Sequence, residues 1–127
     1  MTSELDVEGI DAVNTRGKWG GIVMSGSAAL NTQDGTDASE GVVSTYGGGA
    51  NPRNDDSSGA LTYVQIKYAG FAFSPTNELN SLALQGVGSG TVIDYINVHN
   101  GADDGVEFYG GTVDAKHLVV SGSDDDA

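Results

Sequence analysis

Two stretches in the second half of the chain decide the fold: Ser81-Leu82-Ala83-Leu84-Gln85-Gly86 and Gly105-Val106-Glu107-Phe108-Tyr109-Gly110. A third copy of the pattern stands earlier, at Gly21-Ile22-Val23-Met24-Ser25-Gly26. Each copy begins with a small residue, places apolar residues two apart and ends in glycine. This alternation is typical of a strand with one buried face. Leu82 and Val106 are 24 residues apart, so the pattern recurs at the period of a repeat protein.

A second set of strands alternates with the first along the chain. In these strands an aromatic residue or a histidine precedes two apolar residues spaced two apart: Tyr63 to Lys67, Tyr95 to His99 and His117 to Ser121. Parallel pairing of each strand with its counterpart one repeat away, at a spacing of about 4.8 Å, would stack the apolar residues into ladders. We therefore predict an all-β, right-handed parallel β-helix (β-solenoid) of three to four coils, as a single domain over residues 1–127. A sandwich of antiparallel hairpins is the rival fold, but it needs tight two-residue turns.

Glycines and two insertions separate the predicted strands. A long stretch of Gly, Ser, Thr, Asn and Asp, at about residues 30–59, is expected to leave the coil as a lateral loop and fold back over its flank. A smaller insertion covers residues 71–79. Glycine tolerates positive φ, and glycines at the coil corners are expected to use it. They are Gly86, Gly88, Gly90, Gly101, Gly105, Gly110 and Gly111.

The charge balance excludes several classes of partner. The chain has 18 acidic residues against 5 basic ones, for a formal net charge of −13. Nucleic acid and anionic membrane surfaces both require positive charge, so neither is an expected partner. No stretch reaches the roughly 20 apolar residues of a membrane span, and the amino end lacks a signal-peptide pattern. The chain has no cysteine, which removes thiol chemistry and disulfides.

The chain also resembles a family of bacterial secreted or lipid-anchored proteins, similar to the pectate-lyase-like right-handed β-helix proteins. The strings that carry the resemblance are Arg16-Gly17-Lys18-Trp19-Gly20-Gly21-Ile22, Tyr63 to Gly70, Asn77 to Thr91 and His99 to Phe108. The resemblance implies this fold and an extracellular or cell-surface location, and it implies no known reaction. Such proteins continue at both ends, so the chain resembles a central fragment. Bare coil ends favour homo-oligomers, unless residues 4–14 cap one of them.

Two acidic turns are candidate metal ligands. Asp103 and Asp104 follow one strand of the second set, and Asp124 and Asp125 follow the next strand one coil away. Stacked carboxylates repel unless a cation bridges them, and Ca²⁺ prefers oxygen ligands of this kind. The alternative is that these aspartates only bond to nearby backbone N–H groups. No cofactor is required on either interpretation.

Catalysis has little support in the sequence. A polysaccharide lyase needs a basic residue beside acidic metal ligands, and the five basic residues are scattered along the chain. Lys67, His99 and Ser121 are expected to form one row at outward positions of the second strand set. Solvent-facing strand positions carry polar residues in any case, so the row does not indicate catalysis. His117 aligns with Tyr63 and Tyr95 in a column expected to stack. We therefore assign no catalytic residue.

Three aromatic residues are the candidate ligand-binding surface. We predict an exposed platform for sugar stacking, formed by Tyr68, Phe73 and Tyr109. The alternative is that these residues anchor the core or a loop, as large aromatics more often do. The sequence thus favours a non-catalytic extracellular module that binds a glycan or a protein partner, with calcium as a candidate support. The alternatives are a remnant of a metal-dependent polysaccharide lyase or hydrolase, and a purely structural spacer.

Overall fold

The computed structural model describes residues 1–7, 9, 15–40, 44–74 and 77–127. Nearly all of its regular structure is strand, with one short helix near the amino end. The elements in chain order are α1 (Glu4–Val7), β1 (Ile22–Ser25), β2 (Asp37–Ala38), β3 (Thr45–Tyr46), β4 (Ala60–Lys67), β5 (Ala72–Ser74), β6 (Asn77–Glu78), β7 (Leu82–Gln85), β8 (Val92–His99), β9 (Val106–Tyr109) and β10 (Ala115–Ser121).

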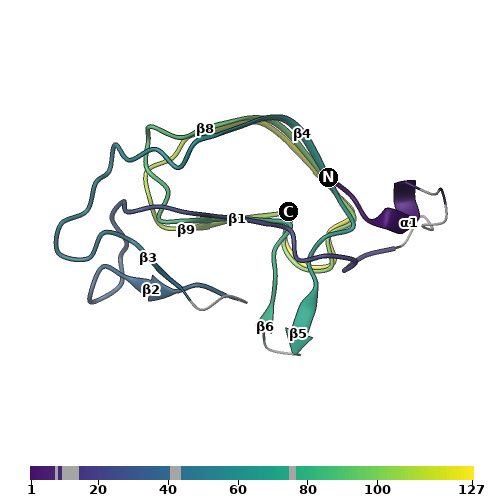
Figure 1. The fold of residues 1–127 in the computed structure, drawn as a ribbon, viewed down its shortest axis with the longest axis horizontal. Coiled ribbons are helices and arrows are strands. Elements are labelled where there is room, and N and C mark those ends of the chain that lie inside the picture. Colours follow the sequence, from purple (N-terminus) through teal and green to yellow (C-terminus); the bar gives the residue numbers. More distant parts are fainter. Residues whose placement is uncertain (8, 10–14, 41–43, 75–76) are drawn as a thin grey trace.

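Two parallel sheets of three strands face each other (Figure 1). One has the order β1-β7-β9 and the other β10-β8-β4, and the chain alternates between them. In the first sheet Leu82 lies opposite Ile22 and Val106, which confirms the register expected from the repeat. Pairing within both large sheets is parallel, so the antiparallel sandwich is wrong.

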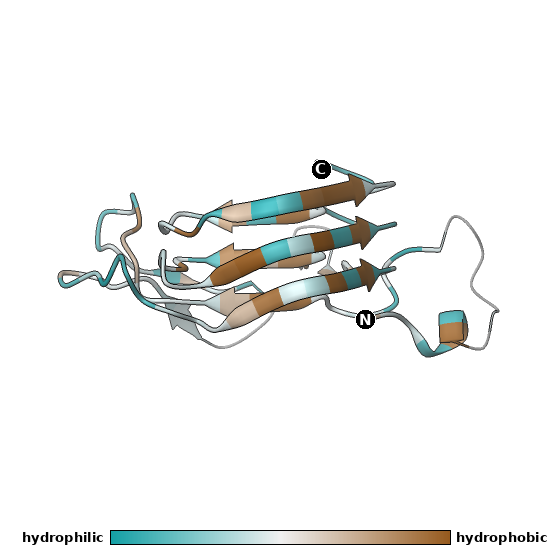
Figure 2. Ribbon diagram, turned by 90° about the horizontal axis from the view of Figure 1, so that it is seen from above, coloured by the Kyte–Doolittle hydropathy of each residue, from teal (hydrophilic) through white to brown (hydrophobic). Residues whose placement is uncertain are grey.

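The core lies between the two sheets and is built from columns of apolar side chains. Figure 2 shows the strands as two stacked layers, with apolar residues concentrated in parts of each strand. The fully buried members of the core cluster come mainly from the two central strands, because β7 and β8 have a neighbour on each side. They are Ile66, Ala69, Leu82, Leu84, Val87, Ile93, Ile96 and Val98.

Each strand of the β4-β8-β10 sheet bends at one residue with left-handed backbone geometry. Tyr63, Tyr95 and His117 have φ values of 54°, 53° and 50°, which are unusual for residues with large side chains. The bend changes the alternation, so that Ile93 and Ile96, three residues apart, are both buried. The three bent residues are not paired in the strand register, although the residues on either side of them are. They lie one above another on the outer surface.

The rings of these three residues form a stack, which we call the aromatic ladder. The ring centroids of Tyr63 and Tyr95 are 4.7 Å apart and those of Tyr95 and His117 are 4.2 Å apart, with interplanar angles of 5° and 6°. His117 Nδ1 also lies 2.7 Å from Asp94 Oδ1. The expectation that this column stacks is confirmed, and the stacking offsets part of the backbone strain.

The amino-terminal residues lie along part of the open edge of β4. The backbone N–H of Lys67 donates to the carbonyl of Met1, and the Met1 ammonium donates to the carbonyl of Gln65 at 2.5 Å. In α1, Asp6 Oδ2 lies 2.7 Å from Lys67 Nζ. Residues 1–7 thus cover one edge, as expected for a cap, whereas residues 8 and 10–14 of the predicted cap lie outside the described residues.

Both insertions lie on the outer side of the β1-β7-β9 sheet (Figure 1). The longer one, residues 26–59, contains the antiparallel hairpin of β2 and β3 and folds back over the sheet as predicted. Ser39 Oγ donates to Gln85 Oε1 at 2.7 Å, so Gln85 is only 1% exposed although it points outward. The shorter insertion forms the hairpin of β5 and β6.

The corner glycines serve two different purposes. Gly86 and Gly110 have φ values of 59° and 66°, as expected. Gly88, Gly90, Gly101 and Gly105 do not adopt positive φ, so the expectation is wrong for them. Their backbone is instead closely approached: a Cβ would lie 2.5 Å from Ser81 Oγ at Gly101 and 2.2 Å from Val120 Cγ1 at Gly105.

Among the residues that the structure describes, no helix has the length and apolar character needed to cross a membrane.

Candidate functional site

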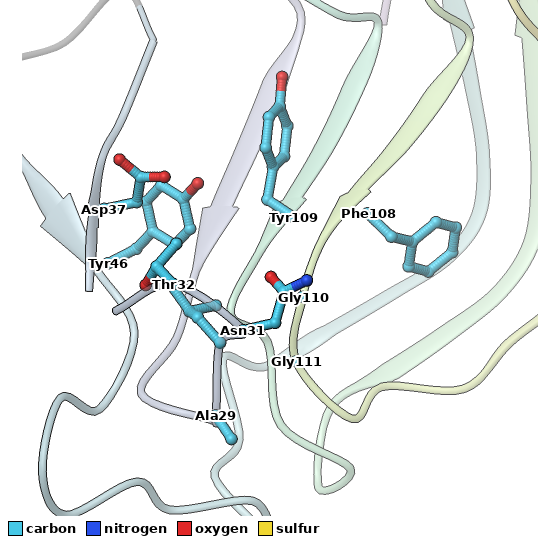
Figure 3. A pocket seen from close by; sticks show the side chains of 10 residues that line it. Ala29, Asn31, Thr32, Asp37, Tyr46, Phe108, Tyr109, Gly110 and Gly111 are labelled. Carbon is cyan, nitrogen blue, oxygen red and sulfur yellow. The ribbon is translucent and has the colours of Figure 1, made fainter. Parts of the chain in front are cut away.

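A pocket of about 430 Å³ lies where the long insertion meets the end of β9 (Figure 3). Its walls come from two parts of the chain that are distant in sequence, namely the insertion and the turn after β9. The lining residues are Ala29, Leu30, Asn31, Thr32, Asp37, Tyr46, Phe108, Tyr109, Gly110 and Gly111. Its volume is within the range of ordinary small-ligand sites.

The strand pattern of β9 determines which side chains face the pocket. Alternation sends Tyr109 to the outer face of the sheet and Phe108 to the opposite face. Figure 3 shows Tyr109 on the same side as Tyr46 and Asp37, with Phe108 pointing away from them. The rings of Tyr46 and Tyr109 meet edge to face, with centroids 6.1 Å apart. The pocket therefore has two tyrosines on its outer side.

Two hydrogen bonds hold the Tyr109 hydroxyl in place, and a third fixes its partner Asn80. Its hydroxyl donates to Glu40 Oε2 at 2.8 Å and accepts from Asn80 Nδ2 at 2.8 Å. The same amide nitrogen donates to Glu107 Oε2 at 2.6 Å. Asn80 is 2% exposed, so this network connects the pocket to a buried part of the sheet's outer face. Fixed polar groups of this kind preorganise a binding site.

The pocket has a negative electrostatic environment. Burial raises the pKa of Tyr46, and the carboxylates of Asp37, Glu40 and Glu107 raise it further. The pKa of Tyr109 is raised strongly, first by burial and then by the neighbouring carboxylates of Glu107 and Glu40, the second of which accepts the hydrogen bond of the hydroxyl. Burial is the larger cause of both shifts, and the carboxylates add to it because a negative potential opposes ionisation of a phenol.

A second candidate site lies at the acidic corner between β8 and β9. Carboxylate oxygens of Asp103, Asp104 and Asp125 lie within 4.8 Å of one another. Burial, followed by repulsion from Asp104, raises the pKa of Asp103 to about 6. Three of the four predicted metal ligands are thus brought together. Asp124 is not among them, because its Oδ1 lies 3.1 Å from Arg16 Nε.

The predicted aromatic surface does not form. Tyr68 is only 6% exposed, because it packs beside His99 and under the Lys67 ammonium, so the expectation that it faces solvent is wrong. Phe73 is 56% exposed, but it lies on the β5–β6 hairpin and contacts Phe71. Tyr109 alone of the three lines the pocket.

The predicted polar row is present on the β4-β8-β10 sheet. Lys67, His99 and Ser121 occupy matching register positions. His99 Nδ1 lies 3.0 Å from Ser121 Oγ, and Lys67 forms its ion pair with Asp6. The side chains in this row thus bond to one another or to α1, as expected for a solvent-facing strand position.

Sequence reasoning missed the half of the pocket that comes from the insertion. Asn31, Thr32, Asp37 and Tyr46 stand in a polar stretch without periodicity, and Glu40 reaches Tyr109 from the same stretch. Strand periodicity cannot place such residues. The only available signal was the length of the insertion, since long loops on a rigid scaffold often carry function.

Comparison with known proteins establishes the family and nothing narrower. No curated protein and no solved structure matches this chain significantly. The sequence model of one family matches residues 3–127, which is nearly the whole chain. The matched residues include all the strands of the two parallel sheets described above. The chain therefore belongs to the family described as the pectate-lyase-like β-helix domain.

Proposed function

We propose that this chain is a non-catalytic glycan-binding module of an extracellular or cell-surface protein. Its scaffold is a right-handed solenoid of about three coils, and its binding site is the pocket between the long insertion and β9. The observation that carries the proposal is the lining of that pocket, where the rings of Tyr46 and Tyr109 stand beside the polar side chains of Asn31, Thr32 and Asp37.

This combination of groups suits a sugar. A pyranose ring presents C–H groups on its faces and hydroxyl groups around its edge. Aromatic rings pack against the faces, and amide, hydroxyl and carboxylate groups bond to the edge. The hydrogen-bond network of Tyr109 fixes the orientation of one aromatic wall, which lowers the entropy cost of binding.

The test is binding of an oligosaccharide panel by isothermal titration calorimetry. Tyr109→Ala removes one wall of the pocket, and we expect it to weaken binding at least about tenfold. Phe73→Ala is the matched control, because Phe73 is an exposed aromatic outside the pocket. Equal loss in both variants, or binding unchanged by Tyr109→Ala, would contradict this location. Failure of every oligosaccharide would favour a spacer or a protein-binding module.

Calcium is proposed to support the module at the acidic corner. Three carboxylates within 4.8 Å repel one another, and this repulsion adds to burial in raising the pKa of Asp103. A cation bound only by the folded state at a hundred times its dissociation constant would add about 2.7 kcal/mol to the free energy of unfolding. We expect calcium to raise the thermal midpoint by roughly 4–8 °C, and Asp103→Asn to abolish the rise. Asp55→Asn, an equal change of charge elsewhere, should retain it.

A remnant of a polysaccharide lyase is the second candidate. Arg16 lies at the acidic corner, where its Nε donates to the carbonyl of Gly122 at 3.0 Å and pairs with Asp124. One basic residue therefore stands beside the acidic corner. An ion pair stabilises the charged guanidinium, however, and a lyase base has to be neutral when it accepts a proton. Cleavage of a uronate polymer, lost in Asp104→Ala while the fold survives, would establish the lyase and overturn our proposal.

A further inference from the structure

We infer that the pocket beside Tyr109 accepts a protonated amino sugar and rejects uronate sugars. The inference rests on the proposed function and concerns the same site. It differs from what a pectate-lyase-like fold would imply, because pectate is a polymer of uronates. The argument depends on the charges that surround the pocket.

Three carboxylates act on the pocket. Asp37 lines it, and Glu40 accepts the hydrogen bond of the Tyr109 hydroxyl. Glu107 stands two residues before Tyr109 on the same face of β9 and bonds to the Asn80 amide that also reaches Tyr109. An ammonium group entering the pocket would meet negative charge from both the insertion and the sheet.

The same carboxylates already influence the neighbouring phenols. The pKa of Tyr46 is raised by burial and then by Asp37, Glu40 and Glu107, which shows that their potential reaches the pocket wall. The potential that disfavours a phenolate would disfavour a uronate carboxylate in the same position. It would equally favour a cation, because the sign of the interaction reverses.

Among the described residues, no basic side chain stands in the pocket wall to offset this potential. None of the five basic residues of the sequence lines the pocket. Three of them are already held in ion pairs, namely Arg16 with Asp124, Arg53 with Asp56 and Lys67 with Asp6. Lys116 lines a different pocket, beside Asp94 and Asp114. A uronate would therefore enter without a counter-charge.

Asp37 is the carboxylate best placed to bind the amine directly. Its Oδ1 accepts the backbone N–H of Ala38, which fixes the carboxylate at the start of β2. The side chain remains exposed, and Figure 3 shows it close to the Tyr46 ring. A cation bound there would donate a charge-assisted hydrogen bond to Asp37, and would gain a favourable cation–π contact if it lies over the face of a tyrosine ring.

The experiment compares three probes of equal length: an oligosaccharide of glucosamine, the same oligosaccharide with every amine acetylated, and an oligogalacturonate. Affinities are measured by calorimetry at low salt, with a chelator present so that calcium cannot bridge a uronate to the acidic corner. The pH is set where the glucosamine amine is protonated. We expect the glucosamine oligosaccharide to bind about tenfold more tightly than its acetylated form, and the galacturonate not to bind. The preference should shrink as salt is added.

The variant Asp37→Asn should abolish the preference for the free amine, because it keeps an acceptor oxygen for Ala38 and removes the charge. Asp55→Asn removes one negative charge outside the pocket, as Asp37→Asn does inside it, and should retain the preference. Equal affinity for the free and acetylated amines, or tighter binding of galacturonate, would overturn the inference and leave glycan binding intact. Failure of all three probes would overturn the inference, and failure of the whole oligosaccharide panel would overturn the proposed function as well.

Discussion

The two sheets of this molecule have similar inner faces and different outer faces. Both bury columns of apolar residues between them, with Leu82 and Ile96 almost fully inaccessible. Outside, the β1-β7-β9 sheet is covered by the long insertion, so Gln85 is 1% exposed. The β4-β8-β10 sheet is open, and Tyr63 is 79% exposed. The comparison shows that inward residues maintain the repeat, whereas the covering of the outer face determines where a site can form.

The largest expected difference in stability is between variants of two glutamines, Gln85 on the covered outer face and Gln65 on the open one. Gln85→Ala removes the acceptor of Ser25 Oγ and Ser39 Oγ and leaves a cavity under the insertion. We expect a loss of about 3 kcal/mol in the free energy of unfolding. Gln65→Ala, on the open face, should cost less than about 0.5 kcal/mol. Urea denaturation measures both, and equal losses would mean that the insertion does not cover the sheet.

The aromatic ladder provides the second test, this time within the open face. Tyr95 stacks on both neighbours, so Tyr95→Ala should cost about 2 kcal/mol. Tyr95→Gly should cost about 1 kcal/mol less than Tyr95→Ala, since glycine adopts the positive φ of this position without strain. Thermal unfolding followed by circular dichroism compares the two variants. If alanine proved better tolerated than glycine, the backbone would not be left-handed here.

A third test compares two tyrosine hydroxyls. Tyr109→Phe removes a group that donates to Glu40 and accepts from Asn80, and we expect a loss of about 1 kcal/mol. Tyr63→Phe removes a hydroxyl from an exposed ring of the ladder and should change the free energy of unfolding by less than about 0.5 kcal/mol. Chemical denaturation is the measurement. A larger loss for Tyr63→Phe would reverse the assignment of covered and open faces.

The smallest expected effect concerns pH. The hydrogen bond from Lys67 holds the pKa of Asp6 below its ordinary value of 3.8. A lowered folded-state pKa stabilises the fold above the unfolded pKa, and that contribution disappears as the pH falls through the lowered value. Asp6→Asn should therefore flatten the acid side of the plot of thermal midpoint against pH. Glu4→Gln, in the same helix, is the control, and an identical change in both variants would rule out the ion pair as the cause.

The inner columns could be predicted from the sequence, because period-two alternation and a 24-residue repeat fix which residues face inward. Leu82, Leu84 and Val106 are examples. The stacking of Tyr63, Tyr95 and His117 followed from the same alignment. The left-handed backbone of that column did not, since nothing local favours positive φ for a tyrosine, and only the stack compensates for it.

The site was less predictable for a physical reason. Asp103 and Asp104 lie in the short turn between β8 and β9, so the repeat placed them near Asp125. Tyr68 immediately follows a strand end, and alternation alone does not indicate that it packs beside His99 and is covered by Lys67. Asp37, Glu40 and Tyr46 depend on how an aperiodic segment returns to the sheet, which is a tertiary property of the whole chain.

The place where the long insertion leaves and rejoins the sheets has a consequence for how such proteins diversify. The same gap between the two sheets is bridged by residues 26–59 after β1, by residues 86–91 after β7 and by residues 110–114 after β9. The flanking strands keep their register in all three cases. Segments of very different length are thus interchangeable at this junction, so evolution or an engineer could graft a new recognition loop there, and acquire a new ligand, while the hydrophobic columns stay the same.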